Sequence, residues 1–269
     1  MSPAEKIARF RALHHGPKAF VIANPWDAGS ARVLAGLGFE ALATSSGAQA
    51  GVLGRKDGAV TREEALAHAR AIVEAVDIPV SADLEKCFAD APREAAETIR
   101  LAAAIGLAGG SIEDTRGHRP EDTYDFSLAV ERVAAAAETA KKSGFVLTAR
   151  TENFLRGRTE LDETIERLQA FEKAGADVLM APGVPDLQSV KLICESLSKP
   201  FNFMAGIRGK SFSVAELEAA GVRRVSLATS LWRAALSGLV EAAREVKEKG
   251  TFGYLERSLA TPEVARFMR

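Results

Sequence analysis

The sequence predicts a (β/α)8 TIM barrel, a closed ring of eight parallel strands surrounded by helices. Eight apolar runs of strand length alternate with segments of helical periodicity along the chain. Such alternation is typical of a parallel sheet with crossover helices, and eight units in 269 residues fit a closed barrel. A doubly wound open sheet is the alternative, but the chain lacks the glycine-rich fingerprint with which such sheets bind nucleotide phosphates.

The elements follow one another without a long linker, so we expect a single domain over residues 1–269. A helix over residues 3–14 begins it. The predicted strands cover residues 19–23, 41–44, 79–82, 109–112, 145–149, 178–180, 201–203 and 224–227. Helices are predicted over residues 62–76, 92–105, 127–142, 161–174 and 187–197. Residues 251–269 are expected to form a helical tail, whose apolar side chains pack on a partner subunit or cover the barrel.

A weak internal repeat supports this order of elements, because it places a glycine between a helix and the next strand. The repeat is LGFEALATS at residues 37–45, IGLAGGSIED at 105–114, AGADVLMAP at 174–182 and AGVRRVSLATS at 220–230. Glycine accommodates the left-handed backbone that commonly ends a helix. The apolar residues that follow are expected to enter the barrel.

Composition and charge narrow the class of protein. Hydrophobic residues make up 47% of the chain, which suffices for one large core, and the net charge is -1. We expect no nucleic-acid partner, because there is no basic patch, and no membrane span or export signal, because no apolar run is long enough. Cys87 and Cys194 are too few for a disulfide framework and fit a reducing compartment. A cytoplasmic protein is therefore expected.

Charged side chains follow three neighbouring strands at the point where each strand ends. Asp83 and Glu85 follow the third strand, Glu113 and Asp114 the fourth, and Arg150 and Glu152 the fifth. The carboxyl ends of parallel strands meet at one rim, where barrels of this kind carry their active sites. Carboxylates suit Mg2+ or Mn2+, and we favour Asp83 and Glu113 as ligands because two acids from neighbouring strands would repel without a cation. The alternative is that the acids pair with Arg150 or cap helices, which we favour for Asp114 and Glu152.

Two further features of this rim suit an anionic substrate. Arg150 presents a planar fork that fits a carboxylate, phosphate or phosphonate, although it could equally neutralise the adjacent acids. Residues 44–48, Thr-Ser-Ser-Gly-Ala, form a small polar turn whose backbone N–H groups could bind a substrate carboxylate. A plain strand-to-loop turn is the alternative.

Five motifs in order resemble the isocitrate lyase and phosphoenolpyruvate mutase superfamily over about residues 15–250. They are NPWDAGSARVLAGLGFEALATSSGA, the GRKDG that holds Asp57, PVSADLE, GGSIED and LTARTENF. The resemblance implies Mg2+-dependent chemistry on 2-oxo or 2-hydroxy acids through an enolate-like intermediate. It also implies a barrel whose last helix is swapped between subunits of a homodimer or homotetramer.

The resemblance assigns roles to individual residues. It implies that Ser46, Gly47 and Ala48 bind the substrate carboxylate and that Arg150 holds a substrate oxygen or anionic group. The metal is implied at Asp83, with Asp57, Glu85 and Glu113 acting on it directly or through water. Arg150, Asp57 and Glu113 are the implied catalytic residues, and Trp26 and Asn202 are implied to line the substrate site.

The chain departs from the family pattern in two loops. The stretch D-x-D-T-G-Y-G appears as Ser-Ala-Asp-Leu-Glu-Lys-Cys at residues 81–87, so one acid is replaced by Ser81 and both glycines are absent. The K-[KR]-C-G-H loop, which carries the cysteine of isocitrate and methylisocitrate lyases, is replaced by TRGHRP at residues 115–120. We therefore expect neither of those activities. His118 and the arginines beside it are either a lid with acid or anion-binding roles or a solvated surface loop.

These observations favour a carbon–carbon lyase acting on a small 2-oxo or 2-hydroxy acid, by decarboxylation of an oxaloacetate-like acid or by a retro-aldol step. The missing cysteine favours this chemistry because decarboxylation requires no thiol. Two alternatives stay open: phosphorus–carbon chemistry of the phosphonopyruvate hydrolase or phosphoenolpyruvate mutase type, and a non-catalytic 2-oxo acid binding protein.

Overall fold

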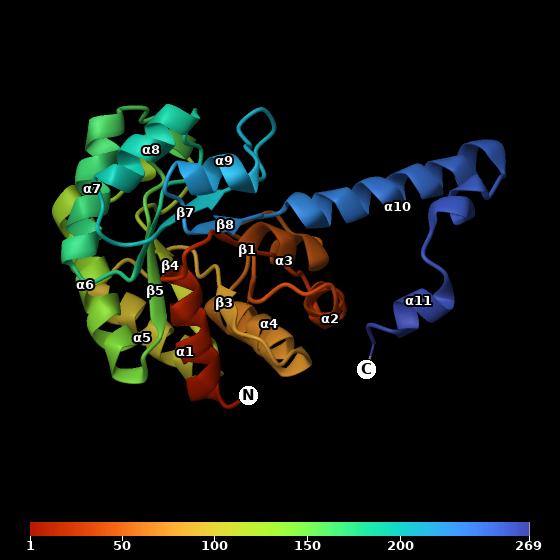
Figure 1. Ribbon diagram of the computed structural model, residues 1–269, viewed down its shortest axis with the longest axis horizontal. Helices are drawn as coiled ribbons and strands as arrows, with labels where there is room; N and C mark the ends of the chain where they lie inside the picture. The colour runs from red at the N-terminus through yellow and green to blue at the C-terminus, as the bar shows by residue number, and fades with distance from the viewer. Residues whose placement is uncertain (269) are drawn as a thin grey trace.

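Eight parallel strands form a nearly closed barrel in the computed structural model, which describes residues 1–268 (Figure 1). The strands are β1 (Phe20–Ile22), β2 (Leu42–Ala43), β3 (Val80–Ala82), β4 (Gly109–Glu113), β5 (Val146–Arg150), β6 (Val178–Met180), β7 (Phe201–Met204) and β8 (Arg224–Ser226). From β2 to β8, each strand pairs with the next one in sequence, and β1 pairs with β8. A single bridge between Ala23 and Leu42 closes the ring, which confirms the predicted barrel over the open sheet.

Helices connect the strands and surround the barrel. They are α1 (Pro3–His14), α2 (Ala28–Gly36), α3 (Ser46–Val52), α4 (Arg62–Ala75), α5 (Pro92–Ala104), α6 (Phe126–Ser143), α7 (Leu161–Lys173), α8 (Leu187–Glu195), α9 (Val214–Ala219), α10 (Ser230–Lys249) and α11 (Thr261–Ala265). Short 3-10 turns lie at Pro120–Asp122, Asn153–Arg156 and Gly253–Arg257. Within residues 1–268, we find no helix long and apolar enough to cross a membrane.

The alternation of side chains along each strand divides the core in two. One set, which includes Phe20, Val146 and Val178, packs inside the barrel against Phe10 of α1, so α1 closes its amino-terminal end. The other set, which includes Leu147 and Leu179, belongs to the larger core beneath the surrounding helices. Because the period of a strand is two, Thr148 and Arg150 share the inward direction of Val146. The alternation therefore directs both polar side chains into the barrel.

The glycine repeat has a conformational cause. Gly38, Gly106, Gly175 and Gly221 all have positive φ, between 91° and 107°. A side chain at such φ is strained, whereas glycine adopts it freely, so each glycine can turn the chain from a helix into the following strand. The prediction for these four positions is confirmed.

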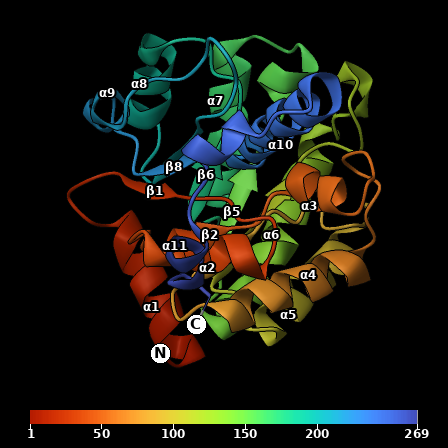
Figure 2. The same cartoon turned by 90° about the vertical axis from the view of Figure 1, so that its right-hand side faces the viewer.

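The C-terminal segment extends away from the barrel. Helix α10 projects outward and α11 comes back toward α2 (Figures 1 and 2). Trp232, near the start of α10, packs on Gly51 of α3, and Phe267 packs on Gly36 of α2. Between these contacts, α10 buries no residue, and Leu239, Phe252 and Leu259 are each about 60% exposed. The exchange of this helix between subunits stays a prediction.

Candidate functional site

A cavity opens at the carboxyl ends of the strands and reaches into the barrel. Its volume is about 470 Å³, open mouth included. It is lined by Ile22, Asn24, Ala43, Thr44, Ser45, Ser81, Ala82, Asp83, Ser111, Thr148, Arg150, Met180, Met204, Arg224, Ser226 and Ala228. Two of the predicted site residues, Asp83 and Arg150, therefore stand on the wall of one cavity.

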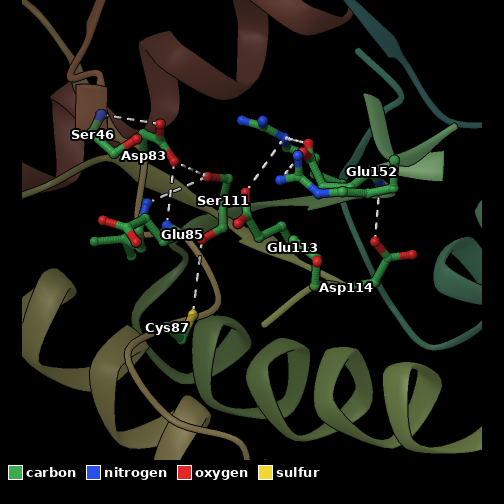
Figure 3. Close-up of polar contacts among 12 residues, drawn as sticks. Ser46, Asp83, Glu85, Cys87, Ser111, Glu113, Asp114 and Glu152 are labelled. Carbon is green, nitrogen blue, oxygen red and sulfur yellow. Dashed lines mark hydrogen bonds and ion pairs between the residues drawn. The ribbon is translucent and has the colours of Figure 1, made fainter. Parts of the chain in front are cut away.

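Hydrogen bonds from three elements hold Asp83 in place. Its Oδ2 accepts from the Ser46 amide at 3.1 Å, and its Oδ1 accepts from the Glu85 amide at 3.2 Å and from Ser111 Oγ at 3.5 Å (Figure 3). The Asp83 amide donates to Thr44 Oγ1 at 3.1 Å. The carboxylate is thus fixed in one orientation at the end of β3, and the Ser46 amide is occupied by it.

The turn that begins α3 leaves two backbone amides without a partner among the described residues. Within residues 1–268, the N–H groups of Gly47 and Ala48 have no hydrogen-bond partner, as the first N–H groups of a helix lack one. A Cβ atom on Gly47 would lie 3.1 Å from Thr229 Cγ2 and 3.2 Å from Asp57 Oδ2. The carboxylate of Asp57 therefore lies directly against this turn, and Gly47 is tightly enclosed.

Negative charge accumulates beside Asp83. Burial raises the pKa of Glu85 to about 7, and repulsion by Asp83 and Asp57 adds to the shift. Glu113, which Figure 3 shows on the other side of the site, has a pKa raised well above its ordinary range by burial, which outweighs the opposing effect of Arg150. The predicted acids therefore converge from β3, β4 and the loop after α3.

Arg150 is held by two carboxylates. Its Nε lies 2.5 Å from Glu152 Oε1 and 3.5 Å from Glu113 Oε2, and Arg156 reaches the other oxygen of Glu152 at 2.8 Å. Burial acts against the charge of Arg150, but Glu152 and Glu113 outweigh it and raise its pKa. Arg150 is therefore a fixed, permanently charged guanidinium.

Asp114 and Glu152 lie behind this pair. Asp114 is buried, forms an ion pair with Arg167 at 3.3 Å and accepts from the Glu152 amide at 2.9 Å. Burial raises the pKa of Asp114, and Arg167 opposes that effect. Glu152 forms the ion pair with Arg150 that the sequence alternative described, whereas Asp114 pairs with Arg167 instead.

The acids fit a divalent cation held mainly through water. Carboxylate oxygens are the donors that Mg2+ prefers, and Mg2+ commonly keeps several waters and takes one or two carboxylates. Within residues 1–268, no three acidic, His or Cys side chains are arranged to hold a metal ion directly. Asp83 is the fixed donor, and a cation beside it would relieve the repulsion that raises the pKa of Glu85.

The loop after β3 retains a glycine-like backbone without the glycines. Glu85 and Cys87, which occupy the two glycine positions of the family pattern, have φ of +50° and +58°. Left-handed backbone costs a residue with a side chain about 1–2 kcal/mol. Cys87 is fully buried, its Sγ points to Ser111 O at 3.8 Å, and burial raises its pKa to about 12. It is therefore not a reactive thiol.

Several predicted residues lie outside the cavity wall. Asn202 is fully buried, donates to Ser226 Oγ and accepts from Arg224 Nε. Trp26 lies in the loop after β1, where its carbonyl contacts His68 Nε2 at 2.8 Å. Neither lines the cavity.

The sequence reasoning also missed polar residues inside the strands. They are Ser111, Thr148, Arg224 and Ser226. For Ser111 and Thr148 the signal was available, since Ser111 precedes Glu113 by two residues and Thr148 precedes Arg150 by two, which places each pair on one face of its strand.

The loop after β4 is anchored beside the site. Tyr124 Oη donates to Asp90 Oδ1 at 2.5 Å, and the guanidinium groups of Arg116 and Arg132 stack on the Tyr124 ring. His118 lies near Gly58, next to Asp57. This loop therefore extends toward the mouth of the barrel. That position is compatible with a lid, which was one of the two alternatives that the sequence offered for His118 and the arginines beside it.

Comparison with known proteins identifies the family. The family model described as phosphoenolpyruvate phosphomutase matches residues 10–247. The chain is 31% identical over 254 residues to 2,3-dimethylmalate lyase of Eubacterium barkeri, covering 91% of this chain and 87% of that protein. It is 30% identical over 248 residues to an oxaloacetate decarboxylase of Pseudomonas aeruginosa, covering 90% and 85%. The crystal structure of a presumed lyase/mutase of Burkholderia cenocepacia superposes with a TM-score of 0.96 at 46% identity, covering 99% and 97%.

The chain therefore belongs to the phosphoenolpyruvate phosphomutase family, within the superfamily that its motifs resemble.

Proposed function

We propose that the protein is a divalent-metal-dependent carbon–carbon lyase that acts on a small 2-oxo or 2-hydroxy carboxylic acid. The observation that carries the proposal is the convergence of a fixed carboxylate, Asp83, and a fixed guanidinium, Arg150, in one cavity. Two relatives, a 2,3-dimethylmalate lyase and an oxaloacetate decarboxylase, are named for cleavage or decarboxylation of small acids, which supports this class of reaction.

Different residues of the site have different roles in such a reaction. The free N–H groups of Gly47 and Ala48 bind the substrate carboxylate. Arg150 stabilises the enolate oxygen that forms when the carbon–carbon bond breaks, and it is already oriented by Glu152 and Glu113. Asp83 would hold Mg2+ or Mn2+, with Asp57, Glu85 and Glu113 bonded to its waters. When bound, the cation supplies Lewis-acid polarisation of the 2-oxo group.

No thiol takes part in this scheme. Cys87 is buried with a pKa near 12, and Cys194 lies on α8, outside the cavity. An isocitrate lyase type of reaction, which uses a cysteine, is not part of the proposal. Decarboxylation of an oxaloacetate-like acid releases carbon dioxide, leaves an enolate that takes a proton from water, and needs only the groups already described. A retro-aldol step on a substituted 2-hydroxy diacid needs in addition a carboxylate of the site that accepts the hydroxyl proton.

Assembly and location complete the proposal. We expect a homodimer or homotetramer in which α10 packs on a partner, because this helix buries none of its residues within one chain. The unpaired thiols of Cys87 and Cys194 fit the reducing cytoplasm.

The experiment is a turnover assay with a panel of 2-oxo and 2-hydroxy acids, with and without Mg2+. We expect Mg2+-stimulated product formation that Asp83→Ala reduces at least 100-fold, because the fixed donor is lost. Asp77→Ala is the matched control, since Asp77 is exposed and belongs to an ion pair with the amino terminus. Full activity of Asp83→Ala would contradict the role of this carboxylate. Phosphate release from phosphonopyruvate, with an inert acid panel, would favour the phosphorus–carbon alternative.

A further inference from the structure

A second arginine stands at the inner end of the same cavity. Arg224 begins β8, faces Asn202 of β7 across the sheet and is only 5% exposed. It lines the cavity together with Ser226, which follows it by two residues on β8, and Thr148, which precedes Arg150 by two residues on β5 and so lies deeper in the barrel. The cavity thus runs from a mouth with Asp83 and Arg150 to a floor with Arg224.

The partners of Arg224 carry no charge. Its Nε donates to Asn202 Oδ1 at 2.8 Å and its Nη2 to Thr148 Oγ1 at 2.9 Å. Its Nη1 lies 3.3 Å from His14 Nε2, and His14 Nδ1 lies 2.8 Å from the Phe10 carbonyl. Because that carbonyl can only accept, Nδ1 carries the ring proton and Nε2 accepts from Arg224. Burial and Arg224 lower the pKa of His14 to about 3, so the ring is neutral.

This arrangement differs from that of the three arginines around Glu152 and Asp114. Arg150, Arg156 and Arg167 each form an ion pair with a buried carboxylate. Within residues 1–268, Arg224 forms none, and burial alone lowers its pKa to about 9. A buried charge without a counter-ion is unfavourable, and a guanidinium has five N–H groups, of which three are used here. The two remaining N–H groups and the uncompensated charge favour an anion.

Hydroxyl groups surround the space that such an anion would occupy. Ser81, Thr148 and Ser226 line the cavity, and each of these hydroxyls can donate to an oxygen, whereas the Ser111 hydroxyl already donates to Asp83. The acids that would repel an anion, Asp83 and Glu113, stand at the carboxyl ends of β3 and β4, toward the mouth. The floor therefore combines a positive charge with several neutral donors.

We propose that the inner end of the cavity, formed by Arg224, Thr148 and Ser226, binds a carboxylate group or a free anion of similar size. If the group belongs to the substrate, it is the distal carboxylate of a diacid, and this version rests on the proposed function. If it is free, formate or bicarbonate has the required chemistry. In either case, Arg224 is a binding residue that selects for negative charge at the floor.

Calorimetry with malate and 2-hydroxybutyrate in the presence of Mg2+ tests the first source. The two acids differ only in a distal carboxylate that replaces a methyl group. We expect wild-type protein to bind malate at least 10-fold more tightly and Arg224→Met to lose this preference, with little change for 2-hydroxybutyrate. Formate titrated into metal-free protein tests the second source. If the anion is free, formate binds the wild type and not Arg224→Met, and the wild type binds malate and 2-hydroxybutyrate equally. Neither titration depends on turnover, so a failed lyase assay leaves the result intact.

Controls separate binding from folding. Arg223→Met removes the neighbouring arginine, which does not line the cavity, and is expected to leave every affinity unchanged. If Arg224→Met does not fold, Arg224→Lys and Thr148→Val replace it, each expected to weaken the same binding event about 3-fold or more. The proposal would be overturned if the wild type neither prefers malate nor binds formate. It would also be overturned if the folded variants bind these ligands as the wild type does.

Discussion

Arg150→Met tests the electrostatic arrangement of the site. In the wild type, the Arg150 Nε lies 2.5 Å from Glu152 and 3.5 Å from Glu113, whose side chains are 1% and 14% exposed. Removing one partner of a buried ion pair costs about 3–5 kcal/mol, because the other charge stays buried. Glu152 keeps Arg156 at 2.8 Å, so Glu113 is the carboxylate left uncompensated. We expect a loss of about 3 kcal/mol in the free energy of unfolding at pH 8.

The loss should shrink as the pH falls. The pKa of Glu113 is already raised by burial, and removing Arg150 raises it further, so this buried, uncompensated carboxylate is neutralised by a proton more readily at pH 5.5 than at pH 8. Urea unfolding at both pH values measures the difference. Arg150→Lys keeps a positive charge and should lose about 1 kcal/mol. The matched control is Arg158→Met, since Arg158 and Glu163 form a pair about one-third exposed that should contribute less than about 1 kcal/mol. Equal stability of Arg150→Met and wild type at pH 8 would refute the reasoning.

Two further predictions concern the closed end of the barrel and the docking of α10. The pKa of His14 falls from 6.5 in the unfolded chain to about 3 in the folded protein, so the unfolded chain takes up a proton first as the pH falls. Stability is therefore lost from about pH 6.5 downward, by as much as about 5 kcal/mol. Urea unfolding of His14→Gln should show a pH dependence that is smaller by about one proton, and an identical slope would contradict the prediction. A Cβ on Gly51 would lie 2.2 Å from Trp232, so Gly51→Ala should lower the free energy of unfolding by about 1–3 kcal/mol. Gly238→Ala, in the exposed middle of α10, should instead raise it by about 0.5–1 kcal/mol. Thermal unfolding compares the two variants, and the reverse order of stability would show that Trp232 does not dock on α3.

The barrel could be predicted because its signals are local. Apolar runs, helical periodicity and the glycines before four strands each depend on a few neighbouring residues. The ends of β4 and β5 were placed one residue too early, because Glu113 and Arg150 are charged, yet they pair within the sheet. The backbone groups of these two residues form hydrogen bonds across the strands, so the strands continue through them despite their charged side chains.

The floor of the cavity could not be predicted in the same way. Arg224 and His14 are 210 residues apart in the chain and meet only because α1 closes the barrel beneath β8. Nothing near Arg224 in the sequence shows that its partners are neutral. The left-handed backbone of Glu85 was hidden for a similar reason, since the surrounding hydrogen bonds, not the residue itself, impose that conformation.

The most direct test of the proposed activity is detection of carbon–carbon cleavage itself. Wild-type protein with Mg2+ would be incubated with 13C-labelled oxaloacetate and with substituted malates, and the products would be followed by NMR. We predict pyruvate and carbon dioxide, or the retro-aldol fragments of a malate, at a rate that depends on Mg2+ and falls at least 100-fold in Asp83→Ala. Intact substrates across the whole panel, with a folded wild-type protein and Mg2+ present, would contradict the proposed lyase.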